Sequence, residues 1–600
     1  MCIKSVRSHI LLFAAAIMLN TPAFATDVSV SGFIRQEMAY KTTNDENIFN
    51  QGGNLFNDKT ITSTFSGVDV TRDGENTSNN WGLMATRAEL DFQIRFSDNW
   101  DAFVKLRAFY DYGVYDNFEG TNYFEVPFYG DCGTALEVCG DDYMVDLPSA
   151  YLDYNNGPLW LRIGNQQIAW GEALFFRVAD VANGLDLRRH SFVDWASEEY
   201  SDERIASPGI RASYRFSDEW ELEVFTQQFS PTIYGNENTP YNVIFSAFVI
   251  QQEDGFDKVD DHWNSGFRLR AQLGDLGLQF FASSRRNPDG VFRWTESNIN
   301  PFVGAGGILE SFVGPNLADS PFELDTQGVW TAEEWYYYAG AARLDGVTAL
   351  DASIAEFQGS QNLGAFQVTG DPSGTCGALG LDERDCAGFE LDFFFDSTGS
   401  GFGPLRGNLA REYPYENVFG WGFNYVTFAE PDSFLDQLVT RFEMSYTPDK
   451  KFTRPSLSRE YIEEDEFVAS LIFEKYHRFS ESFPSTFMVL EYMFKSESDM
   501  FGRHVSGFDN DGRPKGDSNF HAIAFAFQQP SSDLLWRYDF ALLYDLNGGL
   551  FAQPGVRYTP SGAITVDAYA NIFYSDGGND DIIESIETAN EIGLRIGYQF

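Results

Sequence analysis

Apolar and polar side chains alternate with a period of two along many segments of this chain. The clearest case is residues 88–112, where every second residue is apolar and the residues between them are mostly charged or polar, with a break at Ser97-Asp98-Asn99. Because successive side chains of a strand point to opposite faces, this predicts a hairpin with one lipid-compatible face and one wet, charged face. The apolar set is Ala88, Leu90, Phe92, Ile94, Phe96, Trp100, Ala102, Val104, Leu106, Ala108 and Tyr110.

The same unit recurs along the chain, for example over residues 210–224, 267–280, 434–446 and 534–572. Counting such units predicts about eighteen strands, with sixteen as the alternative. The links between them alternate between short turns and long loops, with one exception at Asn547-Gly548-Gly549. The expected short turns are Ser97–Asn99, Asn155–Pro158, Ser217–Glu219, Gly274–Asp275, Ala429–Ser433, Phe479–Ser482, Pro530–Asp533 and Thr559–Gly562. The long links include Lys41–Gly82, Gly113–Pro148, Ser230–His262 and Asn287–Pro414.

This pattern predicts an all-β fold, a transmembrane antiparallel β-barrel with long external loops, at least one of them folded inward. Outer-membrane barrels have an even strand number, short periplasmic turns and longer external loops. Both chain termini are then expected on the periplasmic side.

The two ends of the sequence also predict export to the outer membrane. Lys4 and Arg7 precede an apolar run from Ile10 to Leu19 and the small-x-small site Ala23-Phe24-Ala25, which is typical of a secretory signal peptide. We therefore expect residues 1–25 to be removed after export through the Sec route, and residues 26–600 to form one barrel domain. In the last strand, every second residue from Ile592 to Phe600 is apolar. A terminal Phe on such a strand resembles the signal that the outer-membrane assembly machinery reads.

Composition supports a barrel and narrows its partners. Aromatic residues make up 16% of the chain, with 57 Phe and 29 Tyr, as expected for a lipid face with aromatic girdles. The formal net charge of -48 argues against a nucleic-acid partner. The expected surroundings are outer-membrane lipid and lipopolysaccharide, where acidic loops either bind divalent cations or are simply solvated.

Four cysteines remain after the signal, Cys132, Cys139, Cys376 and Cys386; their two close pairs predict two loop disulfides rather than a metal site.

One segment carries a specific resemblance. Arg162-x-Gly164-x-Gln166-x-x-x-Trp170-Gly171, followed by Asp180-x-x-Asn183-x-x-Asp186, resembles the outer-membrane family called domain of unknown function 1302. The strand at Ser31-Gly32-Phe33, the hairpin at Leu90–Tyr112 and the strand after Tyr413-Pro414 resemble it as well. Gly184 departs from the pattern, which has proline there. The resemblance implies a large barrel that cooperates with a periplasmic companion and an inner-membrane lipid transporter, and hence a hydrophobic or lipid-like cargo.

Residues 166–190 are too polar for a lipid-facing strand, so we expect them to fold inward as a constriction or partial plug. Their polar side chains either line a substrate path or form a hydrogen-bonded network that braces the wall, since buried polar groups must be paired. The candidates are Arg162, Gln166, Trp170, Asp180, Asn183, Asp186 and Arg188.

Basic residues recur at inward positions despite the acidic composition. A ring of such charges would favour an anionic solute, but acidic residues share the same face and would pair with them across strands. The candidates for the pore wall are Arg87, Arg95, Lys105, Arg107, Arg268 and Arg270, with Arg215, Arg441, Arg557 and Arg595 on the same face.

Other function classes find little support in the sequence. There are six His, and neither a G-x-S-x-G nor an H-E-x-x-H motif occurs, so we expect no enzyme activity, no metal and no cofactor; a barrel-embedded hydrolase is the remote alternative. The first strand is expected from Asp27, which leaves no room for the plug domain of an energised receptor. The leading hypothesis is a channel for hydrophobic or amphipathic small molecules, and the alternative is a porin-like pore for polar or anionic solutes.

Overall fold

The structure, a computed structural model, describes residues 27–43, 47, 49, 55–56, 58–72, 80–112, 132–134, 136–140, 142–187, 204–234, 242, 244–251, 259, 261–370, 374–396, 401–431, 433–509, 512–576 and 583–600. The proposed signal peptide lies outside these residues. Among them, no helix is both long and apolar enough to cross a membrane.

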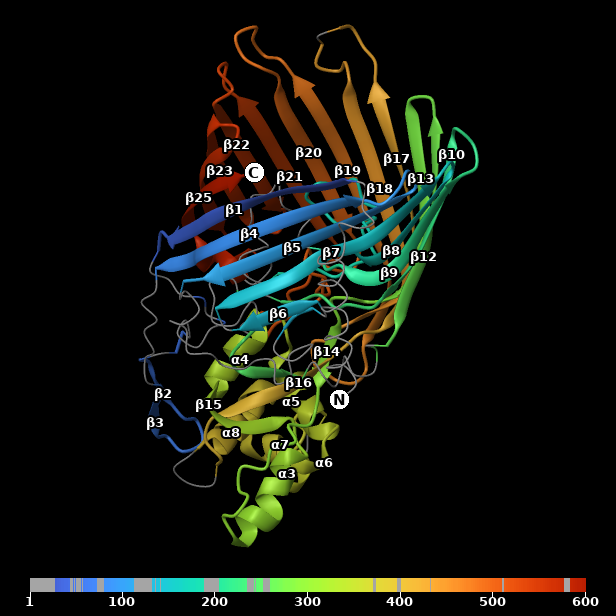
Figure 1. Ribbon diagram of the computed structural model, residues 1–600. Coiled ribbons are helices and arrows are strands. Elements are labelled where there is room, and N and C mark those ends of the chain that lie inside the picture. The colour runs from blue at the N-terminus through green and yellow to red at the C-terminus, as the bar shows by residue number, and fades with distance from the viewer. Residues whose placement is uncertain are drawn as a thin grey trace.

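An 18-stranded antiparallel barrel forms the body of the molecule (Figure 1), so the predicted fold and strand count are confirmed. In order around the wall, its strands are β1 (Asp27–Lys41), β4 (Trp81–Arg95), β5 (Trp100–Asp111), β7 (Tyr143–Asn156), β8 (Leu159–Gln166), β9 (Ser207–Arg215), β10 (Trp220–Gln228), β12 (Trp263–Leu273), β13 (Leu276–Arg286), β17 (Tyr415–Thr427), β18 (Leu438–Phe452), β19 (Ile462–His477), β20 (Thr486–Lys495), β21 (Phe520–Pro530), β22 (Trp536–Asp545), β23 (Leu550–Ser561), β24 (Ile564–Tyr574) and β25 (Glu591–Gln599).

The last strand closes the barrel against the first. β25 pairs antiparallel with β1 from Phe33↔Gln599 to Lys41↔Glu591. Gly32 and Phe600 exchange two main-chain hydrogen bonds of 3.0 Å. Closure leaves no open edge among the barrel strands, which is the condition for a sheet to span a lipid bilayer.

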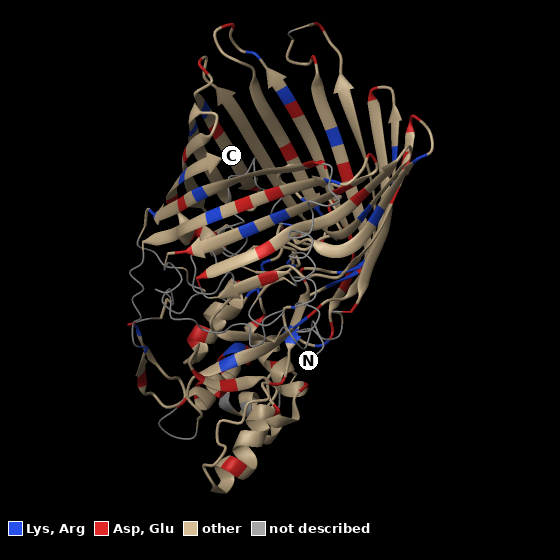
Figure 2. Cartoon of the chain, in the orientation of Figure 1, with Lys and Arg blue, Asp and Glu red and all other residues tan. Residues whose placement is uncertain are grey.

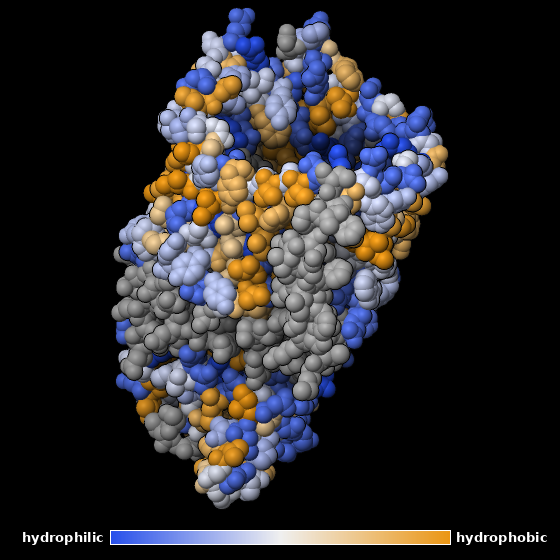
Figure 3. Space-filling view, viewed as in Figure 1, coloured by the Kyte–Doolittle hydropathy of each residue, from blue (hydrophilic) through white to orange (hydrophobic). Residues whose placement is uncertain are grey.

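The two faces of the wall differ as the alternation predicts. Large apolar side chains are exposed on the outside, for example Val30, Phe267 and Phe280, and Figure 3 shows orange side chains over this outer wall. Charged residues pair on the inner face, for example Lys105 with Glu89 and Arg268 with Glu223, and Figure 2 shows acidic and basic residues on neighbouring strands. The outer belt therefore matches hydrocarbon and the inner face does not.

The links follow the predicted alternation with small shifts. Most short turns lie where expected, but the turn between β17 and β18 extends to Gln437, so Phe434 belongs to the turn and not to a strand. Leu534, also expected in a strand, lies in the turn before β22 with a positive φ of 59°. In both cases the apolar side chain is exposed at the end of the barrel, 52% for Phe434 and 66% for Leu534, so alternation at a strand end does not set the strand boundary.

The link Asn287–Pro414, expected to be a loop, carries a folded unit that we call the loop domain, residues 287–414 together with β11 (Phe248–Gln251). It contains the short sheet β11, β16 (Leu405–Glu412), β14 (Val291–Trp294) and β15 (Phe322–Val329). Its helices are a π-helix at Leu309–Val313, α3 (Gly314–Ala318), α4 (Ala332–Ala341), α5 (Gly346–Ala355), α6 (Gln358–Asn362), α7 (Thr375–Leu379) and α8 (Glu383–Phe395). The remaining elements are β2 (Thr60–Thr62), β3 (Asp69–Thr71), β6 (Glu137–Gly140) and a 3-10 helix at Glu584–Ala589.

The loop domain covers the long-loop end of the barrel (Figure 1, bottom). Its core is aromatic: Trp294 and Trp335 stack at 6.2 Å, and Phe248 packs against both. The hydrophobic pattern does not predict these helices, because they are buried on more than one side and lack a single apolar stripe; α4 buries Glu334 and Trp335 alike.

Candidate functional site: a segment across the lumen and the cavity beside it

The chain enters the lumen directly after β8, as predicted. We call residues 167–187 the crossing segment. It leaves β8 at the fully buried Gln166, and its Ile168, Trp170 and Ala179 are at most 1% exposed. Because its contacts reach from β10 to β21, it spans the barrel rather than following the adjacent wall.

Trp170 fixes the start of the crossing segment to the wall. Its indole N–H donates to Glu223 of β10 at 2.5 Å, and its ring packs edge-on against Phe225. Arg268 of β12 lies over the same ring, donates to the Trp170 carbonyl at 3.2 Å and pairs with Glu223 at 3.1 Å. A third donor, Arg211, contacts Glu223 at 2.8 Å, so this buried carboxylate is fully compensated.

Two further wall carboxylates hold the middle of the crossing segment by its main chain. Glu443 of β18 accepts hydrogen bonds from the N–H groups of Glu172 and Ala179. Glu491 of β20 accepts from Leu174 at 2.6 Å and Phe175 at 3.0 Å. Both carboxylates are at most 1% exposed. They replace the hydrogen bonds that an irregular segment in the lumen would otherwise lack.

The motif residues Asp180 and Asn183 shape the return of the crossing segment. Asn183 accepts from the Ile168 N–H at 2.8 Å and donates to the Ile205 carbonyl. Asp180 pairs with Arg204 and accepts from the Trp170 N–H. Arg177 donates to the carbonyls of Asp180 and Asn183. These contacts tie the two ends of the crossing segment together.

Gly184, the departure from the family pattern, has a local reason. A Cβ atom at this position would lie 2.7 Å from the main-chain nitrogen of Thr232 and 2.9 Å from the Pro231 carbonyl carbon. Beside it, Asp186 forms a parallel bridge with Ile233. The absent side chain lets the crossing segment lie directly against residues 231–233, which follow β10.

Most of the predicted basic residues are paired with carboxylates of the wall. Arg87 and Lys105 share Glu89, Arg107 forms two hydrogen bonds to Asp146, and Arg162 pairs with Asp153. At the short-turn end, Arg270 pairs with Glu221 and Arg95 lies 3.6 Å from Asp101. Gln166 donates to the Gly209 carbonyl at 3.2 Å, and Arg188 lies outside the described residues. Of the predicted set, Gln166, Trp170, Asp180, Asn183 and Arg268 meet around the crossing segment, Asp186 lies near its end against Ile233, and the other described candidates lie elsewhere on the wall.

The wall residues Glu223, Glu443 and Glu491 were not among the candidates. Glu491 is an isolated acidic residue in an otherwise apolar strand segment, Val489-Leu490-Glu491-Tyr492-Met493, whereas Glu223 and Glu443 have another charged residue two positions before them. A carboxylate between apolar neighbours is costly to bury without a partner. An acidic residue such as Glu491 in an apolar strand segment is therefore a sequence signal for a buried carboxylate that binds another part of the chain.

A cavity of about 550 Å³ lies between the crossing segment, the loop domain and strands β18 to β24. Aliphatic and aromatic side chains make up most of its lining, including Phe176, Phe248, Val468, Met493, Leu543 and Phe573. A smaller cavity of about 50 Å³ lies inside the loop domain beside Leu317 and Phe394. The larger one is within the size range of small-molecule sites.

Charged groups gather on one side of the large cavity. Lys450 and Glu466 form an ion pair, Arg285 pairs with Glu416 at 2.7 Å, and Lys495 donates to the Asp499 carbonyl at 2.6 Å. Burial raises the pKa of Asp289, but Arg177, a hydrogen bond from Thr232, Arg285 and Lys450 together lower it below its ordinary value. A buried carboxylate with a lowered pKa indicates a positive potential at that side of the cavity.

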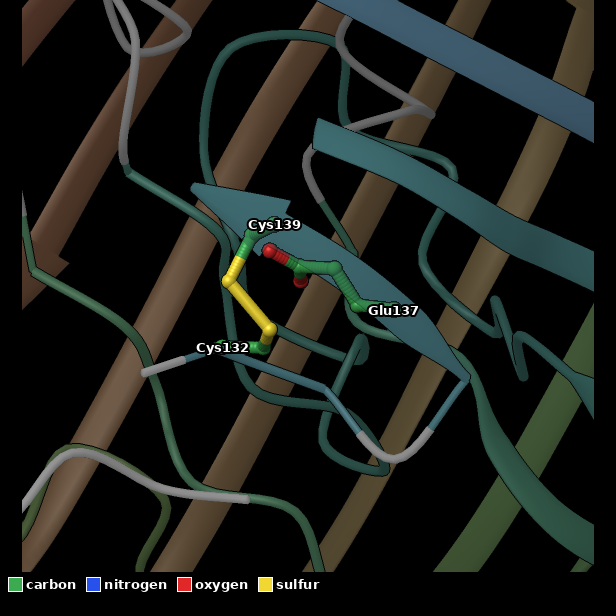
Figure 4. Close-up of side chains that lie close together, drawn as sticks. All are labelled: Cys132, Glu137 and Cys139. Atoms are coloured by element: carbon green, nitrogen blue, oxygen red, sulfur yellow. A yellow bond between two sulfur atoms is a disulfide. The ribbon is translucent and has the colours of Figure 1, made fainter. Parts of the chain in front are cut away.

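Both predicted disulfides are present, Cys132–Cys139 and Cys376–Cys386. Figure 4 shows the first, with Glu137 beside it. These three residues have the proximity of metal ligands, but the two sulfurs are bonded to each other and neither is a thiolate. The second disulfide joins α7 to α8 in the loop domain.

Comparisons with known proteins place the chain in a family. No curated protein matches the sequence. Solved structures with a similar barrel include OccAB3 of Acinetobacter baumannii, 8% identical with a TM-score of 0.42 over 96% of this chain and 99% of that one. Another is OccK2 (OpdF) of Pseudomonas aeruginosa in complex with glucuronate, 8% identical with a TM-score of 0.41 over 96% and 98%. The Escherichia coli carbohydrate-binding barrel Wzi is 10% identical with a TM-score of 0.37 over 97% and 86%.

These likenesses are too distant to indicate a function. The family model described as "Protein of unknown function (DUF1302)", in contrast, matches residues 7–600, which includes the crossing segment and its motif. The chain belongs to the family DUF1302.

Proposed function

We propose that the protein is an outer-membrane channel for hydrophobic or amphipathic small molecules. The carrying observation is the cavity of about 550 Å³ inside the barrel, lined mainly by aliphatic and aromatic side chains. A pore for hydrated solutes would gain nothing from such a lining, because water binds weakly to an apolar wall. An apolar cargo would gain about 25 cal/mol for each Å² of apolar surface it buries there.

The crossing segment forms one side of this cavity. Phe176 and Val178 of the segment pack against Val468, Met493 and Phe520 of β19, β20 and β21. We therefore expect cargo that leaves toward the short-turn end to pass the crossing segment, and its release to need movement of that segment.

A binding measurement on the protein in lipid nanodiscs tests the proposal. The probe is N-phenyl-1-naphthylamine, a neutral apolar dye whose fluorescence rises in apolar surroundings, with empty nanodiscs as the blank. We expect saturable binding that Met493→Trp weakens at least tenfold by filling the cavity. Leu490→Trp, on the same strand but 43% exposed on the outer face, is the matched control and should bind as the unaltered protein does. Absence of saturable binding, or equal effects of the two substitutions, would overturn the proposal.

The second candidate is a porin-like pore for polar or anionic solutes. It is favoured by the inner wall toward the short turns, where Arg215 and Arg270 face Glu221 and Figure 3 shows a hydrophilic opening. Single-channel recordings separate the two: a large, steady conductance supports the porin, and a small conductance together with dye binding supports the apolar cargo.

Cooperation with an inner-membrane transporter is a further proposal, and its support is the family resemblance alone. A photo-crosslinking residue in the short turn at Ser480, which is exposed, should yield adducts with a periplasmic or inner-membrane protein in cells. A photo-crosslinking residue at position 303 in the loop domain is the control and should yield no such adducts.

A further inference from the structure

The charge of the cavity wall differs from that of the chain as a whole. Acidic residues outnumber basic ones by 89 to 41 in the sequence. Among the residues that line the cavity the order is reversed, with seven basic and three acidic side chains. The basic residues are Arg177, Arg285, Arg343, Lys450, Lys451, Lys495 and Arg503, and the acidic ones are Asp180, Asp289 and Glu466.

Ion pairs neutralise only part of this charge. Glu466 is hydrogen-bonded to Lys450 and also interacts electrostatically with Lys495, so two ammonium groups share one carboxylate. Asp180, in contrast, is already paired with Arg204. Lys495 is 7% exposed and its ammonium group donates to the main-chain carbonyl of Asp499.

Arg177 is placed in the same way. Its guanidinium donates to the carbonyls of Asp180 and Asn183, and its buried Nε atom has no hydrogen-bond partner. Main-chain carbonyls orient a cation without neutralising it. The carboxylates of Asp289 and Glu466 interact electrostatically with these two cations, Arg177 and Lys495, but Lys450 acts on the same two carboxylates. Arg177, Lys450 and Lys495 are therefore three cations against two carboxylates next to an apolar cavity, where an unbalanced charge is costly.

We propose that the cavity binds an amphipathic anion, with its apolar body among Phe176, Val468 and Met493 and its anionic head against Arg177 and Lys495. This rests on the proposed function and adds the charge of the cargo to it. A monoanionic head would supply the one negative charge that balances these three cations and two carboxylates, and the low polarity of the site would strengthen the attraction. The lowered pKa of Asp289, on the same side of the cavity, is consistent with a positive potential that would attract the head.

Three probes with one chain and different heads test the inference: decanesulfonate, decanol and decyltrimethylammonium. Each competes with N-phenyl-1-naphthylamine for the protein in nanodiscs, and its partition into empty nanodiscs is subtracted. We expect decanesulfonate to displace the dye at a concentration at least tenfold lower than decanol, and decyltrimethylammonium to be the weakest. Equal displacement by decanesulfonate and decanol, or a preference for the cation, overturns the anionic site and leaves the proposed function standing. Failure of the dye to bind at all is the failure of the proposed function itself.

Substitutions locate the head group. Lys495→Met keeps the Lys450–Glu466 pair, and Arg177→Met removes the second cation; each should cut the preference for decanesulfonate over decanol about tenfold without changing the affinity for decanol. Arg478→Met is the matched control, because Arg478 also donates to main-chain carbonyls but lies in an exposed turn. Folding of each variant is checked by heat-modifiable gel mobility. If the preference survives in the folded double variant Arg177→Met/Lys495→Met, the assignment of the head-group site is wrong.

Discussion

The carboxylate of Glu491 accepts a hydrogen bond of 2.6 Å from the main-chain N–H of Leu174, which joins positions 317 residues apart in the sequence. The same carboxylate also accepts from Phe175. The wall of the barrel thereby holds the crossing segment by its main chain, whatever side chains the segment carries. If the crossing segment moves, this contact and its counterpart at Glu443 must break.

Glu491→Gln should loosen the crossing segment and raise the conductance of the channel. The amide keeps one acceptor oxygen and turns an N–H toward a main-chain N–H, so at least one charge-assisted hydrogen bond is lost, at a cost of about 1.5–3 kcal/mol. Planar-bilayer recording should show a larger and noisier conductance. Glu221→Gln, on the inner wall but paired with Arg270, is the control. An unchanged conductance in Glu491→Gln would mean that this contact does not hold the crossing segment in place.

Trp170 should contribute to stability through its volume more than through its indole N–H. Trp170→Ala empties a buried site and should lower the free energy of unfolding by about 3–5 kcal/mol. Trp170→Phe should cost about 1 kcal/mol, because Glu223 keeps Arg211 and Arg268 as donors. Urea-unfolding midpoints of the two variants in lipid measure the difference. Equal losses would show that the hydrogen bond to Glu223 dominates.

Glu390 should make the loop domain less stable as the pH rises. Burial raises the pKa of Glu390 from 4.5 to about 8, against a hydrogen bond from the Phe366 N–H that lowers it, and Asp351 raises it further. The folded state therefore holds this proton more tightly than the unfolded state. Its contribution is fully present below about pH 4.5 and is lost as the pH rises to about 8.

Hydrogen exchange of α8 between pH 6 and pH 9, corrected for the intrinsic rate, measures this effect. Protection should fall across the range in the unaltered protein and should change less in Glu390→Gln, which cannot ionise. A parallel pH dependence in both proteins would assign the loss of protection to another group.

Reduction of Cys376–Cys386 should loosen the loop domain and leave the barrel intact. The bond closes a loop with a sequence separation of 10, for which chain entropy predicts roughly 2–3 kcal/mol. Limited proteolysis after reduction and alkylation should cut near α7 and α8 while the barrel keeps its heat-modifiable mobility. The variant Cys132→Ala/Cys139→Ala, which lacks the other disulfide, should retain the native cleavage pattern of the loop domain. Equal cleavage with and without reductant would contradict the prediction.

The barrel could be derived from the sequence because it depends on patterns between residues that are close together in the chain. Alternation with a period of two assigns each side chain of a strand such as Ala88–Arg95 to lipid or lumen, and turn spacing then fixes the antiparallel order. The close spacing of the cysteines predicted both disulfides, and the polarity of residues 166–190 predicted the inward course of the segment after Gln166. Neither pattern reveals the helices of the loop domain, because Glu334 and Trp335 are buried side by side and leave no single apolar face.

Only the tertiary structure brought together the residues that define the site. The sequence determined that Trp170, Asp180 and Asn183 lie in a polar inward segment, but the partners of that segment are on strands more than 50 residues away, such as Glu223, Glu443 and Glu491. Local pattern sets the face on which each of these carboxylates lies. Closure of the barrel decides which of them meet across the lumen, because strands far apart in the chain come to face one another there.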